Sequence, residues 1–110
     1  MKWMVLFFLF ILTIAPAARC ETVYYYCTST SASHLRIYFS EIFSPLSDID
    51  KSRFQKEFVY YLALHYGESI AGTAYCTVST EMRLAETAKA KEIRDYQNMS
   101  WQVTLTRWKY

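Results

Sequence analysis

The sequence predicts a small α+β domain with the element order β-β-α-β-α-β, in which a four-stranded sheet carries two helices on one face and one disulfide. The chain has 110 residues, 18% aromatic residues and only two glycines, which is typical of one folded domain and excludes a disordered or repeat protein. Short β-branched and aromatic segments alternate with two longer segments of helical character. Three cysteines and an apolar N-terminal segment indicate export to an oxidising compartment.

Residues 1–20 have the composition of a signal peptide. The apolar segment 3–14 carries no charge, has the length of a signal-peptide core and is too short to span a bilayer comfortably. We prefer cleavage after Cys20, with Ala18 as the other small residue before the cut, which leaves a mature domain of residues 21–110. Earlier cleavage leaves Cys20 free or lipidated, and an uncleaved membrane anchor is a further alternative. We therefore predict a periplasmic or secreted protein without a stable membrane anchor.

The net positive charge of the chain comes from the basic residues of this predicted signal peptide. Removing Lys2 and Arg19 with the signal peptide leaves ten basic and ten acidic residues in the mature domain. A charge-balanced domain lacks the electrostatic attraction that nucleic acids and anionic membranes provide. We accordingly expect no nucleic-acid partner.

The first half of the domain predicts two strands and a helix. Residues 22–29 are β-branched and aromatic, and residues 35–43 alternate after a polar turn, so both segments predict strands. Ser47 is a good N-cap, with acidic residues following it in the first turn, for a helix that runs to Tyr66. Gly67 then supplies the left-handed terminator of this helix.

The second half predicts a strand, a helix and a last strand. Residues 73–78 (TAYCTV) have strand composition, and Ser79 or Thr80 can cap the helix that follows directly. This helix covers about residues 81–97 and is rich in Ala, Glu and Lys. Residues 101–110 alternate as the last strand.

Cys27 and Cys76 remain in the mature domain and predict a disulfide. When strand faces are assigned from the aliphatic residues, both cysteines fall on one face together with Ile37 and Phe39. This agreement places strand one between strands two and three and antiparallel to both, with a right-handed crossover through the first helix.

We expect the two helices to cover the cysteine-bearing face and the other face to be open. Tyrosine and tryptophan combine a rigid apolar ring with a polar edge, which suits glycan stacking or a protein interface. The alternative interpretation is that these residues only reflect the strand propensity of a solvated face. The candidate binding residues of this sheet face are Tyr24, Tyr26, Tyr38, Tyr75 and Trp108.

The end of the first helix (FVYYLALHY) is apolar on nearly all sides, which is more than one sheet contact requires. Tyr60 and Leu64 lie outside the stripe formed by Phe54, Phe58 and Leu62. Either the second helix covers them or a partner protein does, and a homodimer is one such partner. Tyr60 and Leu64 are therefore the candidate binding residues of the helix.

The sequence contains no pattern that requires an enzyme. The two histidines, His34 and His65, are interpreted as structural residues. A zinc site made from one histidine and the two cysteines competes poorly with a disulfide. The acidic residues are explained by helix ends and solvated helix faces. We expect no catalytic residue, metal or cofactor.

The motifs YYYC, IYFSEIF, HYG, AYC and WKY cover nearly all of the mature domain and resemble small exported bacterial disulfide-containing α/β proteins of unknown function. Residues 73–107, a strand leading directly into an Ala/Glu-rich helix and a strand, are similar to the second half of the SPOR fold. That resemblance implies binding of bare peptidoglycan glycan on the sheet. We expect a binding module that recognises another protein in the cell envelope, as an inhibitor or immunity protein does, with glycan binding as the alternative.

Overall fold

The computed structural model describes residues 22–45, 50–67 and 73–110. The predicted signal peptide, Cys20 and the Ser47 cap lie outside these residues. Within the described ranges, no helix combines the length and hydropathy needed to cross a membrane. The elements are β1 (Tyr24–Ser31), the 3-10 helix η2 (Ala32–His34), β2 (Arg36–Phe39), α2 (Lys51–Tyr66), β3 (Ala74–Ser79), α3 (Met82–Asn98) and β4 (Gln102–Leu105).

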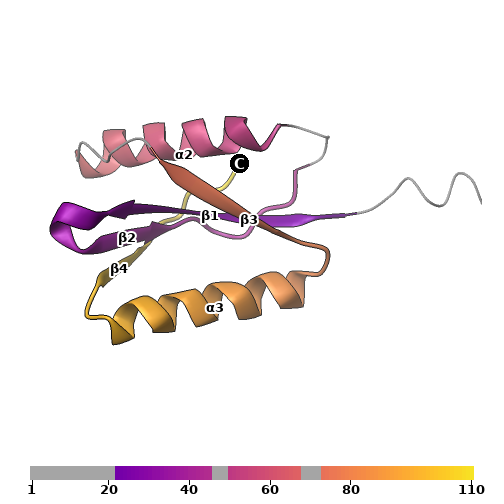
Figure 1. Cartoon of the computed structure of the whole chain (residues 1–110). Helices are drawn as coiled ribbons and strands as arrows, with labels where there is room; N and C mark the ends of the chain where they lie inside the picture. Colours follow the sequence, from indigo (N-terminus) through magenta and orange to yellow (C-terminus); the bar gives the residue numbers. More distant parts are fainter. Residues whose placement is uncertain (1–21, 46–49, 68–72) are drawn as a thin grey trace, which may run out of the picture.

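The strands form one mixed sheet in the order β3-β1-β2-β4 (Figure 1). β1 runs antiparallel to β2 and to β3, which confirms the predicted central position of the first strand. β4 pairs with β2 in parallel and occupies the far edge. After β2 the chain keeps contact with β1 through a bridge between Tyr25 and Phe43. The predicted element order and the mixed α/β composition are therefore confirmed.

The helices lie on opposite faces of the sheet, so the prediction that both cover one face is wrong. Figure 1 shows α2 above the strands and α3 below them. The crossover from β2 to β3 moves across the sheet in one direction, and the crossover from β3 to β4 moves back in the other. Two crossovers of the same hand that run in opposite directions must place their helices on opposite faces.

A core consequently forms on each side of the sheet. The core under α2 contains the disulfide, Tyr38, Phe43, Phe54, Phe58 and Leu62, and the core under α3 contains Tyr26, Ile37 and Phe39. Cys27 therefore shares its face with Tyr38 and not with Ile37 and Phe39, which inverts the faces predicted for the second strand. Apolar alternation cannot identify the covered face of a strand that is buried on both sides.

The helix ends agree with the sequence at one position and differ at others. Gly67 adopts φ 65° and its N–H donates to the Ala63 carbonyl at 3.2 Å, so the predicted terminator is confirmed. The described part of α2 begins at Lys51, where Asp50 is the N-cap, and hydrogen bonds from Ser52 hold the pKa of Asp50 below its ordinary value. α3 has Glu81 at its N-cap position, without a side-chain capping hydrogen bond, and not the predicted Ser79 or Thr80.

The last strand is shorter than predicted. β4 ends at Leu105, and Thr106 follows it with two hydrogen bonds of 2.8 Å, from its N–H and its hydroxyl, to the Phe39 carbonyl. The chain then crosses to the α2 side, where Trp108 and Tyr110 pack against the core. The aromatic C-terminal residues thus cover a core and do not extend the sheet.

Candidate binding surfaces

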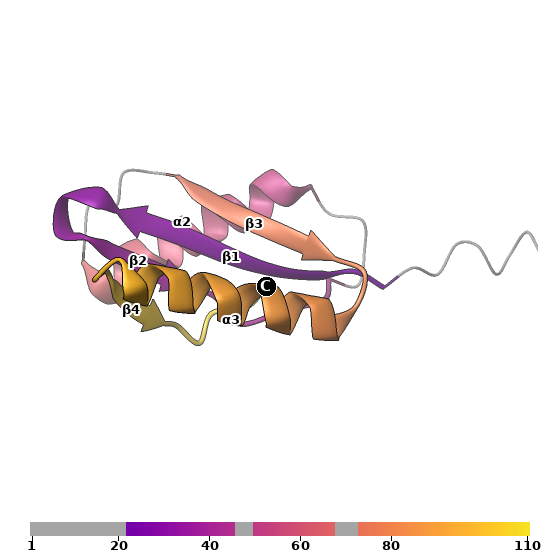
Figure 2. The ribbon, with the colours of Figure 1, turned by 60° about the horizontal axis from the view of Figure 1, so that its bottom comes forward.

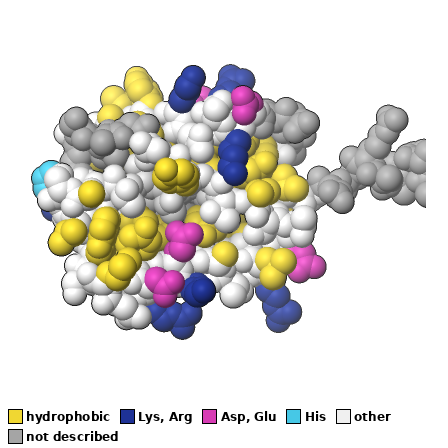
Figure 3. Space-filling view, in the orientation of Figure 1, with side chains coloured by type: hydrophobic (Ala, Val, Ile, Leu, Met, Phe, Trp, Pro, Cys, Tyr) yellow, Lys and Arg dark blue, Asp and Glu magenta, His cyan; other side chains and the backbone are white. Residues whose placement is uncertain are grey.

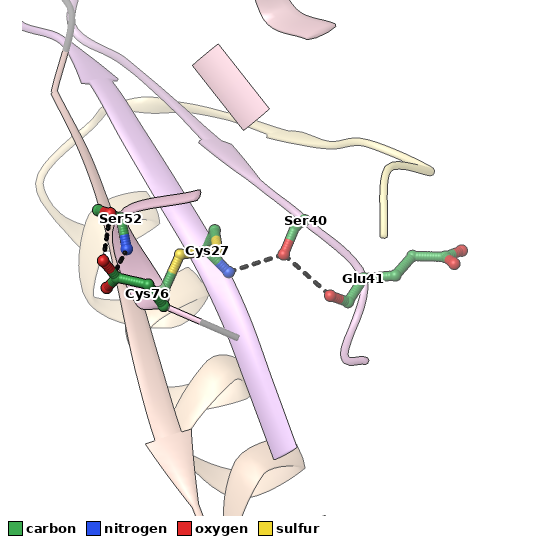
Figure 4. Close-up of a disulfide and its surroundings, with 6 residues drawn as sticks. Cys27, Ser40, Glu41, Ser52 and Cys76 are labelled. Atoms are coloured by element: carbon green, nitrogen blue, oxygen red, sulfur yellow. Dashed lines mark hydrogen bonds between the residues drawn. A yellow bond between two sulfur atoms is a disulfide. The ribbon is translucent and has the colours of Figure 1, made fainter. Parts of the chain in front are cut away.

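The disulfide joins β1 to β3 in the core under α2. Cys27 and Cys76 are directly opposite in the β1–β3 register, with their Cα atoms 4.0 Å apart, and the predicted bridge is confirmed. Figure 4 shows how Ser40 supports it: the Cys27 N–H donates to Ser40 Oγ at 2.7 Å, and that hydroxyl donates to the Glu41 carbonyl at 2.9 Å. The buried Ser40 was not among the predicted functional residues, because nothing local in the sequence distinguishes it from other serines.

Tyr26 and Tyr38, which were predicted to share an open sheet face, are buried on opposite faces. Each is only 1% exposed. The Tyr26 hydroxyl donates to Glu92 Oε1 of α3 at 2.9 Å, while the Tyr38 ring lies against Tyr66 of α2 with centroids 5.1 Å apart. Burial, followed by the hydrogen bond and negative charge of Glu92, raises the pKa of Tyr26 to about 12. Both tyrosines are therefore structural residues in the fold.

The other three residues of the predicted sheet face are also separated. Trp108 is half-buried against Phe43 and Phe58, with ring centroids 5.6 and 5.1 Å away. Tyr24 is half-buried, and Tyr75 is 68% exposed on β3. The predicted aromatic sheet face is therefore not formed, because a helix covers each side of the sheet and the β2 side chains point opposite to the prediction.

The predicted helix residues do lie together on the surface. Tyr60 and Leu64 are one turn apart on α2 and are 67% and 65% exposed, and we call this pair the α2 outer face. The opposite side of α2 is filled by its buried residues. In Figure 3 apolar atoms are visible at the top of the molecule, on the side where Figure 1 places α2. Because α3 lies beyond the sheet, it does not cover the α2 outer face.

A hollow of about 340 Å³ lies between the first half of α2 and the start of β3. Its described lining comes from two segments that are far apart in the sequence, which is why sequence reasoning missed it. Short side chains predominate, and the single charged group is an ammonium. The lining residues are Ser52, Gln55, Lys56, Val59, Thr73 and Ala74.

The histidines have local partners. His34 Nδ1 lies 3.1 Å from the hydroxyls of Ser31 and Ser33, within the β1–β2 connection. The His65 ring stacks on Tyr61 of the same helix, with centroids 4.2 Å apart. Since both described cysteines are oxidised, neither provides a thiolate for a metal.

No family model, curated protein or solved structure matches this chain. The function therefore has to be inferred from the chemistry of these surfaces.

Proposed function

We propose that this protein is an exported, non-enzymatic module that binds another protein of the cell envelope, in the manner of an inhibitor or immunity protein, through the α2 outer face. The observation that carries the proposal is the two-thirds exposure of Tyr60 and Leu64 on a helix whose core side is already filled. Of the two explanations considered for these side chains, cover by the second helix does not apply, so cover by a partner is the one we adopt.

Energetics support a protein partner. Burying a large apolar side chain in an interface contributes about 1.5–3 kcal/mol, so two neighbouring ones can anchor a small interface. Tyrosine is enriched at such anchors because its ring is apolar and its hydroxyl can bond at the rim. The Cys27–Cys76 disulfide supports the exported location, because disulfides persist in oxidising compartments.

The alternative, binding of peptidoglycan glycan, requires an open platform of aromatic rings for sugar stacking. Tyr26 and Tyr38 are buried, and Tyr75 is the only member of the predicted sheet face that is more than half exposed. A single ring is a weak platform, and we therefore favour the protein partner.

Site-specific photo-cross-linking tests the proposal. A photoreactive residue at position 60 or 64 of the exported protein should give a discrete adduct with one envelope protein, and the same residue at the exposed position 91 of α3 should not. The purified partner should then bind wild-type protein and lose binding to Tyr60→Ser/Leu64→Ser. Adducts of the same size from position 91, an adduct of two copies of this chain, or sedimentation with purified peptidoglycan would each contradict the proposal.

A further inference from the structure

Among the residues that the structure describes, no strand pairs with the outer side of β3, and the hydrogen bonds of β1 identify the main-chain groups that point there. The Cys27 N–H donates to Ser40 Oγ, and its carbonyl accepts from the Ser40 N–H, so both groups of Cys27 point toward β2. Tyr25 likewise exchanges both main-chain bonds with Phe43. In an antiparallel pair, two directly opposite residues either both direct their main-chain N–H and C=O toward each other or both direct them away from each other. The β3 residues that face the free edge are therefore Ala74, Cys76 and Val78.

Two of these edge residues are buried. Ala74 is 5% exposed and Cys76 is 4% exposed, whereas Val78 at the other end is 48% exposed. Within the described part of the chain, no hydrogen bond connects the outward main-chain groups of these three residues to another element. Buried main-chain donors and acceptors without a partner are unfavourable, so pairing with them would favour the binding of a ligand.

The hollow lies at the start of this edge. Ala74 is one of its lining residues, and Ser52, Lys56 and Val59 face it from α2. In Figure 2 the N-terminal end of α2 is visible beyond β3, outside the sheet, and Figure 4 shows Ser52 in the surroundings of Cys76. The described lining of the hollow therefore has the start of a strand edge on one side and an overhanging helix on the other. Its one charged side chain is Lys56, which also interacts electrostatically with Asp50.

The overhanging end of α2 restricts which polypeptides can pair with β3. The N-terminal end of α2 overhangs this edge, so a second copy that paired through it at the usual strand spacing of about 4.8 Å would crowd its own α2 end against the first. Packed helices need about 8–10 Å between their axes. A single extended segment brings no helix with it and can enter the hollow.

We infer that β3 binds an extended polypeptide segment of the partner, which adds as a strand along Ala74, Cys76 and Val78 and places an acidic side chain beside Lys56. Main-chain pairing supplies the affinity of such strand addition, and the hollow selects the side chains. β3 itself (AYCTVS) contains none of the Pro or Lys residues that commonly prevent pairing at an exposed edge. The inference rests on the proposed protein-binding function, but its site is the β3 edge and the hollow, whose described lining does not include Tyr60 or Leu64.

Amide hydrogen exchange on the free protein is the first test. The inward amides of Tyr75 and Thr77 pair with β1 and should exchange slowly, while those of Cys76 and Val78 should exchange faster. Equal protection of all four amides would mean that another segment of this chain already occupies the edge, and would overturn the inference.

Selection from a phage-displayed library of short random linear peptides is the second test, with the oxidised full-length mature protein as target. Selected peptides should carry an acidic residue and should slow exchange at Cys76 and Val78. Val78→Pro removes an outward N–H without removing a β1–β3 bond, and should weaken peptide binding about tenfold, while Val78→Ala should leave it nearly unchanged. Equal binding to both variants, or failure to select any peptide, would overturn the inference.

Two further variants distinguish loss of the peptide site from unfolding and from failure of the proposed function. Lys56→Glu should weaken binding of the acidic peptides, and the same charge change at Lys91 of α3 should not. Tyr60→Ser/Leu64→Ser should retain peptide binding even if it loses the envelope partner. If the Lys56, Lys91 and Tyr60/Leu64 variants each lost peptide binding, a site at the β3 edge would be contradicted.

Discussion

Removing the disulfide is the perturbation whose magnitude the structure defines best. Cys27 and Cys76 are separated by 49 positions in the sequence. In the chain-entropy model, a loop of this length restricts the unfolded chain enough to stabilise the fold by about 4 kcal/mol. Domains of this size are usually stable by only about 5–10 kcal/mol. We therefore expect Cys27→Ala/Cys76→Ala to lose roughly half of the free energy of unfolding while keeping the β1–β3 register.

Urea unfolding followed by tryptophan fluorescence measures this loss. The double variant should unfold with a free energy about 4 kcal/mol lower than the oxidised protein. Its dependence on urea should also be steeper, because the unbridged chain exposes more surface when it unfolds. A loss below about 1 kcal/mol, or a loss with an unchanged slope, would refute the argument that the bridge acts mainly on the unfolded chain.

Three more predictions concern the two cores and the surface. Ser40→Ala should lower the free energy of unfolding by about 1–3 kcal/mol in urea titrations, because the buried Cys27 N–H loses its acceptor. The pKa of Tyr26 is raised to about 12, so the folded protein keeps a proton that the unfolded chain releases near pH 10. Stability should therefore fall as the pH rises from about 10 towards 12, and more steeply than in Tyr26→Phe, which urea titrations at pH 9, 10 and 11 would measure. Tyr60→Ser/Leu64→Ser should change the free energy of unfolding by less than about 0.5 kcal/mol, since both side chains are exposed; a larger loss would show that they support the fold.

Local sequence signals were reliable wherever one interaction dominates. Gly67 ends α2 because few other residues adopt a left-handed conformation without strain. β1 and β3 were predicted within one or two residues of their observed bounds, since β-branched and aromatic residues suit a pleated strand. The last strand was predicted too long because alternation continues through Trp108 and Tyr110, whose rings contribute to a core and not to a sheet face.

The candidate site was predictable only in part. Tyr60 and Leu64 lie outside the buried stripe of Phe54, Phe58 and Leu62 as predicted. Whether the second helix would cover them was left open by the sequence, and the structure leaves them exposed. Tyr26 and Tyr38 are buried against expectation, since their strands are covered on both faces and tyrosine is accepted equally in a core and on a surface. Strand composition does not distinguish these two environments.

The sequence by itself determined the order of the elements, the central first strand and the pairing of Cys27 with Cys76, because each depends on local pattern or on the only two cysteines of the predicted mature domain. Tertiary structure alone decided that the helices lie on opposite faces, that β4 joins β2 and that a hollow opens between α2 and the edge of β3. These features depend on the direction in which each crossover traverses the sheet, and side-chain periodicity carries no information about that direction.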